Sequence, residues 1–116
     1  MAKIIETNER ANEDIYKTHY YKTSYEKLKD LYLEILERLD FNVVSIDDAY
    51  AEIYAEIPHM SVQAKIIEQT PVETSIDFYI DSEFLFGNKG RITKFLNTVY
   101  QEIEKNFELK GFSLHK

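Results

Sequence analysis

The chain has 116 residues, no cysteine, and a formal net charge of −7, from 14 Lys and Arg against 21 Asp and Glu. Without cysteine it can form neither disulfide bonds nor thiolate metal sites, and its negative charge repels phosphate backbones, which argues against general nucleic-acid binding. No apolar run approaches the roughly 20 residues of a membrane-spanning helix, and the N-terminus lacks the apolar segment of a signal peptide. We therefore expect one cytoplasmic domain with neither a membrane nor a nucleic-acid partner.

The N-terminal region divides into a polar segment and a first strand. Residues 1–14 are mostly polar after Ile4 and Ile5, and they predict a mobile arm or a weak first turn. Residues 15–22 are rich in Tyr and Thr and contain no Gly or Pro, which favours a strand. The folded domain is therefore expected to span residues 15–116.

The next segment has the pattern of an amphipathic helix from about residue 24 to 39. Thr23-Ser-Tyr-Glu26 matches a capping box, in which the Thr23 hydroxyl would accept a free amide of the first turn. The apolar positions recur on one broad face: Tyr25, Leu28, Leu31, Tyr32, Ile35, Leu36 and Leu39.

After this helix the hydrophobic period changes from 3.6 to 2, which predicts strands at 41–46, 49–57, 61–69 and 72–81. The strictest alternation runs over 49–57, where odd positions are small or aliphatic and even positions are Tyr or Glu. Turns are expected at Asp47-Asp48 and Thr70-Pro71, and Pro58-His59-Met60 breaks the strand pattern between them. Four strands joined by short turns favour an antiparallel meander.

A second amphipathic helix is predicted over residues 89–106. Its apolar positions keep helical spacing: Ile92, Phe95, Leu96, Val99, Tyr100, Ile103 and Phe107. The order strand, helix, four strands, helix predicts an α+β fold: an antiparallel sheet of about five strands with both helices on one face. Over residues 15–107 this order resembles the helix-grip or TATA-box-binding-protein-like architecture, and a trimmed Bet v 1-type lipid-carrier fold. The resemblance implies a fold and assigns no residue a role.

One face of the predicted sheet is a candidate interaction surface. Strand alternation would place tyrosines and carboxylates together on it: Tyr50, Glu52, Tyr54, Glu56, Asp77 and Tyr79. Tyrosine offers a large contact area with few rotatable bonds, so it is common in binding sites. It is also a good strand residue, and a plain solvated sheet surface explains the same pattern.

The segment Gly87-Asn88-Lys89-Gly90-Arg91 is a candidate anion site. It precedes a helix, where free amides and the helix dipole favour negative charge. The candidate residues are Asn88, Lys89, Gly90, Arg91 and Lys94. An ordinary strand-to-helix turn with solvated charges explains this segment equally.

No motif indicates catalysis. His19, His59 and His115 lack metal-site spacing, and no serine occurs in a G-x-S-x-G turn. We expect no metal and no cofactor. The main hypothesis is a non-enzymatic interaction domain that either forms a homodimer or binds a basic protein, as an immunity protein would. The alternatives are a small-molecule or anion binder with a pocket between sheet and helices near Gly87–Arg91, and an enzyme using His19 or His59 with carboxylates.

Overall fold

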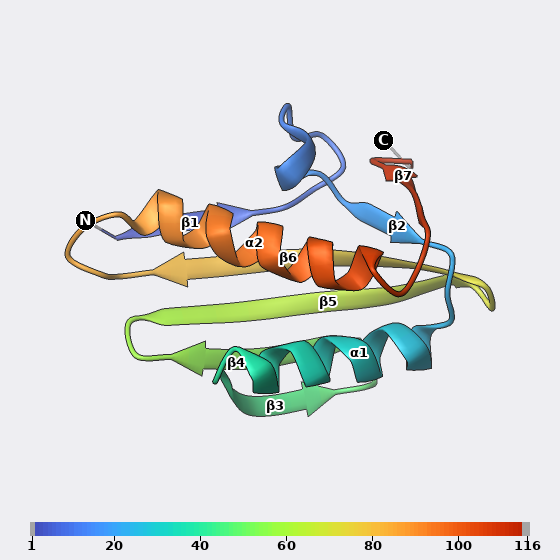
Figure 1. Ribbon diagram of the computed structural model, residues 1–116, viewed down its shortest axis with the longest axis horizontal. Helices are drawn as coiled ribbons and strands as arrows, with labels where there is room; N and C mark the ends of the chain where they lie inside the picture. Colours follow the sequence, from blue (N-terminus) through green and yellow to red (C-terminus); the bar gives the residue numbers. More distant parts are fainter. Residues whose placement is uncertain (1, 115–116) are drawn as a thin grey trace.

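The computed structural model describes residues 2–114, which form two helices and one seven-stranded antiparallel sheet. Both helices lie on the same face of this sheet (Figure 1). The strand order is β3-β4-β5-β6-β2-β7, and β1 pairs with β6 beside β2. The elements are β1 (Lys3–Glu6), a short 3-10 helix η1 (Asp14–Tyr16), β2 (His19–Tyr21), α1 (Tyr25–Arg38), β3 (Asn42–Asp47), β4 (Glu52–Ile57), β5 (Met60–Thr70), β6 (Glu73–Ser82), α2 (Asn88–Glu104) and β7 (Leu109–Phe112).

The predicted α+β class and the antiparallel meander are confirmed, as β3, β4, β5 and β6 pair in chain order. The turn between β4 and β5 consists of Pro58 and His59, so Ile57 lies opposite Met60. His59 adopts a φ of +69°, which lets the chain reverse within two residues. Its carbonyl accepts the amide of Glu83 at 2.7 Å, so this turn is held against the end of β6.

The N-terminal segment differs from the expected arm, because residues 3–6 form β1. This strand lies opposite residues 79–82 of β6, while β2 lies opposite residues 74–76 of the same strand. The predicted first strand at 15–22 is correspondingly short, since residues 14–16 form η1. The strand β1 has only four residues, Lys-Ile-Ile-Glu, which is too short to show a hydrophobic period of its own, so the local pattern did not reveal it.

The first helix starts one residue later than the capping pattern indicated. Ser24 is the N-cap, and its Oγ accepts the amide of Lys27 at 3.3 Å. Thr23 instead lies in the bend after β2, where its carbonyl accepts the Thr74 hydroxyl at 2.9 Å. Thr23 is buried, and the partly exposed Ser24 caps the helix instead.

The core fills the space between the inner sheet face and the two helices. Alternating residues of the central strands are buried there: Ile53, Ala55, Val62, Ala64, Ile66, Ile76, Phe78 and Ile80. The inward alternation of β4 begins at Ile53. Residues 48–51, expected in part to extend this strand, form the turn before it, with Ala51 at a φ of +58°.

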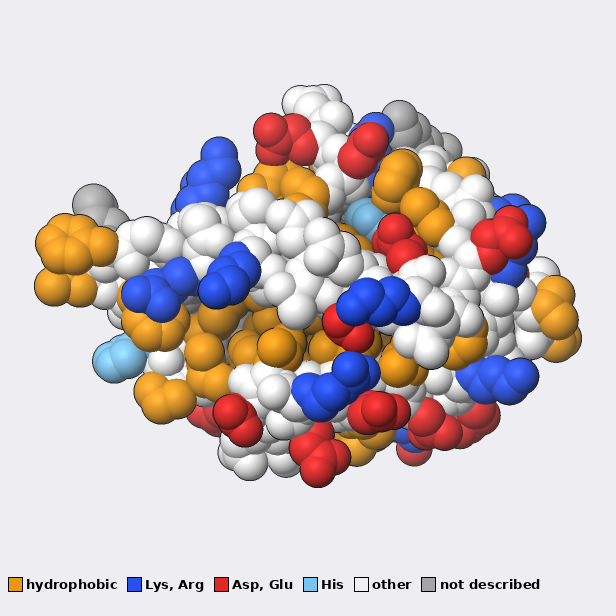
Figure 2. Space-filling view, viewed as in Figure 1, with side chains coloured by type: hydrophobic (Ala, Val, Ile, Leu, Met, Phe, Trp, Pro, Cys, Tyr) orange, Lys and Arg blue, Asp and Glu red, His pale blue; other side chains and the backbone are white. Residues whose placement is uncertain are grey.

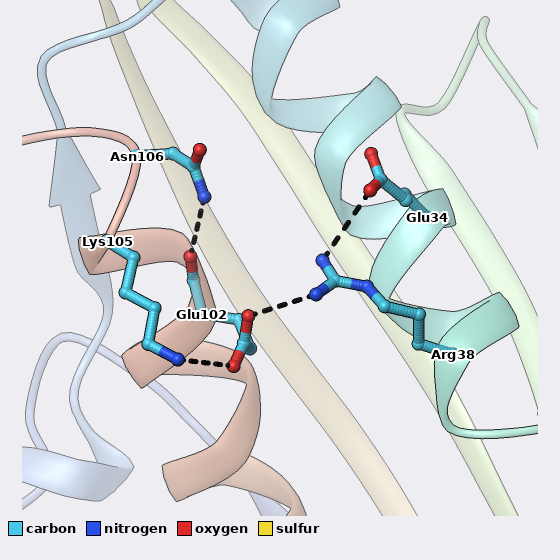
Figure 3. A network of polar contacts seen from close by, with 5 residues as sticks. All are labelled: Glu34, Arg38, Glu102, Lys105 and Asn106. Carbon is cyan, nitrogen blue, oxygen red and sulfur yellow. Dashed lines mark hydrogen bonds and ion pairs between the residues drawn. The ribbon is translucent and has the colours of Figure 1, made fainter.

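A polar network joins the two helices on their solvent side (Figure 3). Arg38 of α1 lies between Glu34 and Glu102, with an Nη1–Oε2 distance of 3.2 Å to Glu102 of α2. Lys105 contacts the other Glu102 oxygen at 3.0 Å. The hydrogen bond from Lys105, with the Arg38 charge, lowers the pKa of Glu102, so this carboxylate stays ionised between the helices.

Candidate functional site

The sheet face opposite the helices carries the predicted tyrosines in one row. Tyr54 of β4 lies opposite Gln63 of β5, and Gln63 lies opposite Tyr79 of β6. Residues paired in this way point to the same side of an antiparallel sheet. The two tyrosines are 37% and 42% exposed, so both rings are accessible to a partner.

Carboxylates occupy the rows on either side of the tyrosines. One row contains Glu52, Lys65 and Asp77, and the other contains Glu56, Ser61 and Asp81. Among the described residues of these three rows, Lys65 is the only cation. We call this surface the outer sheet face: Glu52, Tyr54, Glu56, Ser61, Gln63, Lys65, Asp77, Tyr79 and Asp81.

Two of the predicted residues differ from the expectation, one in its burial and the other in its position. Asp77 is partly buried, and its carboxylate accepts the hydroxyls of Thr7 at 2.7 Å and Thr18 at 2.8 Å. Burial raises the pKa of Asp77, while the two hydroxyls oppose this shift. Tyr50 is 69% exposed, but it lies in the turn before β4 and not in the tyrosine row.

A hollow of about 200 Å³ lies on this face beside Tyr79. Its walls include Glu6 of β1, Glu52, Lys65 and Asp77. Glu6 lies opposite Tyr79 in the β1–β6 ladder, so it continues the tyrosine row. Sequence reasoning missed Glu6, because nothing in its own segment predicted that residues 3–6 join the sheet.

The predicted anion-binding residues separate into two groups. Asn88 is buried, and its side-chain oxygen accepts the Ser82 hydroxyl at 2.7 Å and the Phe84 amide at 2.8 Å, so it shapes the loop. Gly87 caps α2 with a φ of +75°, a conformation that favours glycine. Lys89, Gly90, Arg91 and Lys94 are exposed on the first turns of α2.

A second candidate site lies beside α2. A groove of about 270 Å³ has an apolar lining from several elements: Leu39, Phe41, Ile57, Met60, Phe84 and Phe95. Arg91, Lys94 and Thr98 of α2 form its remaining wall. We call these nine residues the α2 groove. Figure 2 shows apolar side chains gathered between the two helices, with Lys and Arg side chains along one border.

From the sequence we expected the cations of this groove and a pocket near Gly87–Arg91, but none of the apolar residues that line the groove. Its apolar residues come from the end of α1, the β4–β5 turn, the loop after β6, and α2. Each of them looks like an ordinary core residue within its own segment. Phe84 is followed by Leu85 and Phe86, which are each 77% exposed.

The histidines do not converge on a reactive cleft. His19 is buried, stacked on Tyr100 at a ring distance of 3.5 Å. His59 is exposed in the β4–β5 turn, and His115 lies outside the described residues. Within residues 2–114, no three His, Asp or Glu side chains come close enough to hold a metal ion. No helix in this range is long and apolar enough to cross a membrane.

Comparisons with known proteins found no relative of this chain. A scan against models of protein families, a search of curated proteins and a search of solved structures each found no match. The resemblance to the helix-grip architecture therefore stays a prediction.

Proposed function

We propose that this protein is a non-enzymatic interaction domain whose outer sheet face binds a basic segment of a partner protein. The observation that carries the proposal is the row of Tyr54, Gln63 and Tyr79 between two rows that contain carboxylates. Buried aromatic anchors supply much of the affinity of protein interfaces. Complementary charge around them sets the rate and specificity of association.

The tyrosines supply the contact area. Each ring has an apolar body and a hydroxyl that can still bond to water or a partner. Gln63 between them can donate and accept hydrogen bonds, so the row offers both apolar and polar contacts. An arginine side chain fits this surface well, because its planar guanidinium stacks on aromatic rings and pairs with carboxylates.

The charge of the face favours a different protein over a second copy of this chain. A symmetric homodimer brings the same patch of both copies together. Glu52, Glu56 and Asp81 would then approach their counterparts, with Lys65 as the cation available on each side. Like charges across an interface are costly, so we propose a basic partner, as in an immunity protein that binds a basic toxin.

The experiment uses a fluorescent peptide of alternating Arg and Gly as the probe. We expect the protein to bind it in a saturable manner, and Tyr54→Ser with Tyr79→Ser to weaken binding at least about tenfold. Tyr50→Ser is the matched control, because it removes an exposed tyrosine without touching the row. Fluorescence anisotropy gives the dissociation constants.

Bulk charge alone would give a different pattern. In that case both tyrosine variants would bind the Arg peptide as the unmodified protein does, and only added salt would release it. A peptide of alternating Glu and Gly serves as the negative probe. Equal binding of the two peptides, or an unchanged affinity in the double variant, contradicts the proposal.

A further inference from the structure

The α2 groove is an open hollow with an apolar floor. Met60 and Phe95 at its base are almost fully buried, at 5% and 6% exposed, while Phe41 and Phe84 are partly exposed at its sides. The rings of Phe41 and Phe95 lie 5.2 Å apart, so they form one continuous aromatic surface. An apolar ligand placed here would remove this surface from water, which is favourable in proportion to the area covered.

The charged border of the groove has one sign. Arg91 and Lys94 are three residues apart on α2, so they lie on neighbouring turns of the same helix face. The Arg91 guanidinium carbon lies 4.0 Å from the centroid of the Phe84 ring, which fixes the cation above an apolar wall. Among residues 2–114, no Asp or Glu side chain lines this groove.

Arg91 and Lys94 also differ from many other cations of the described chain in their ion pairing. Six cations of the described residues form ion pairs with carboxylates: Lys17, Lys22, Lys29, Arg38, Lys105 and Lys110. Within residues 2–114, neither Arg91 nor Lys94 forms one. The groove therefore combines an apolar floor with positive charge that no carboxylate of the described chain neutralises.

We propose that the α2 groove binds a small amphipathic anion, namely an unbranched aliphatic chain that ends in a carboxylate. The chain would lie on Phe41, Met60 and Phe95, and the carboxylate would meet Arg91 and Lys94 at the border. The groove has a volume of about 270 Å³. This is close to the lower end of the roughly 300–1,000 Å³ of typical ligand pockets, so the groove suits a small ligand. The groove lies on the helix side of the sheet, so this site is independent of the proposed outer sheet face.

Decanoate, used below its micelle concentration, is the probe. We expect one saturable site by isothermal titration calorimetry, with amide NMR shifts concentrated around Phe41, Met60 and Phe95. Arg91→Gln with Lys94→Gln should weaken binding about tenfold. Lys89→Gln is the matched control, because it removes a cation from the same helix end without touching the groove.

Two further arms test the two halves of the ligand separately. Decylammonium has the same chain with the opposite charge, and it should bind at least about tenfold more weakly than decanoate. Thr98→Trp adds a bulky ring at the wall of the groove, and it should abolish decanoate binding while the circular dichroism spectrum stays native. Thr98 is partly exposed on α2, so the substitution leaves the buried side of the helix intact.

Several results would overturn the proposal. These are the absence of saturable decanoate binding, equal binding of decylammonium, or unchanged binding in a folded Thr98→Trp protein. A second copy of this chain is the competing occupant, since Leu85 and Phe86 are exposed next to the groove. Concentration-dependent dimerisation in light scattering that Phe86→Ser removes, and that decanoate fails to reverse, would assign the groove to self-association.

Discussion

His19 is a titratable side chain held in an almost entirely apolar setting. Its ring stacks on Tyr100 with an interplanar angle of 2°, and it meets the Phe112 ring in a T-shaped arrangement with a centroid distance of 4.6 Å. The Nδ1 atom lies 2.8 Å from the Lys17 carbonyl oxygen. Burial lowers the pKa of His19 from 6.5 to about 4, against the smaller opposing effects of that carbonyl and of Asp14. The folded protein therefore favours a neutral imidazole.

This residue should make stability depend on pH in one direction. Because the pKa of His19 is lower in the folded than in the unfolded chain, its contribution is complete above pH 6.5 and is lost as the pH falls towards 4. We expect the free energy of unfolding to fall by up to about 3 kcal/mol over this range, relative to a His19→Phe variant that keeps the stacked ring. Urea denaturation of both proteins at several pH values measures this difference.

The comparison with His19→Phe separates this effect from the carboxylates. Asp77 shifts in the opposite sense, since its raised pKa makes the folded state gain stability relative to the unfolded state as the pH falls through that range. Both proteins contain Asp77, so its effect cancels in the difference. Parallel pH profiles for the two proteins would show that His19 does not titrate as the structure indicates.

At the scale of elements, the long strand β6 pairs with two separate strands, β1 and β2, along the same side. Between them the chain leaves the sheet at Thr7 and returns at Thr18, and both threonine hydroxyls bond to Asp77. The Thr7 hydroxyl also accepts the Phe78 amide at 2.8 Å, and the Thr7 amide bonds to the Phe78 carbonyl at 2.9 Å. Thr7 thus makes the last hydrogen bonds between this segment and β6, just after β1 ends.

Replacing Thr7 with Val should loosen β1 selectively. The variant keeps the shape of the side chain but leaves the buried Phe78 amide without its acceptor, at a cost of about 1–3 kcal/mol. We expect a matching fall in the free energy of unfolding, with faster amide hydrogen exchange in residues 3–6 than in α2. Ile4→Thr, at an exposed position of the same strand, is the control and should stay within about 0.5 kcal/mol. Uniform exchange rates across both elements would argue against a local role.

The elements that could be predicted from the sequence are those with their own hydrophobic period. The apolar positions of α2 and the alternation from Thr74 to Ile80 identify their buried faces without reference to the rest of the chain. The strand β1 has no such period, because its pairing partner supplies its stability. The apolar lining of the α2 groove escaped prediction for a related reason: it joins residues as distant in the sequence as Leu39 and Phe95, and no local pattern indicates that such residues meet.

At the scale of the whole molecule, charge is distributed unequally between the two sides of the sheet. The outer sheet face carries Glu52, Glu56, Asp77 and Asp81, whereas the α2 groove carries Arg91 and Lys94. The excess of acids over bases gives a formal net charge of −7. Such an excess destabilises a compact state by self-repulsion.

Added salt should therefore stabilise the folded protein. Raising KCl from about 10 mM to 150 mM shortens the screening length from roughly 30 to 8 Å, which weakens repulsion across the molecule. We expect the midpoint of thermal unfolding to rise by about 4 °C, equivalent to somewhat less than 1 kcal/mol for a chain of this size. Differential scanning calorimetry over a KCl series measures this shift.

A variant with fewer charges on the outer sheet face provides the control. Glu52→Gln with Glu56→Gln removes two of the repelling carboxylates, so its unfolding midpoint should respond less to KCl. A midpoint that falls with KCl in both proteins would mean that the surface ion pairs outweigh the repulsion.

The two-residue turn at Pro58-His59 has a consequence for how this chain tolerates changes in length. It fixes which residues of β4 and β5 face each other, and alternate residues of those strands belong to the core or to the outer sheet face. An insertion or deletion there that is passed on to β4 as a one-residue shift would exchange its two sets, burying Tyr54 and Glu56 and exposing Ile53 and Ala55. The exposed turn at Pro58-His59 belongs to neither proposed binding site. A change in its length could nevertheless disrupt the core and the outer sheet face together.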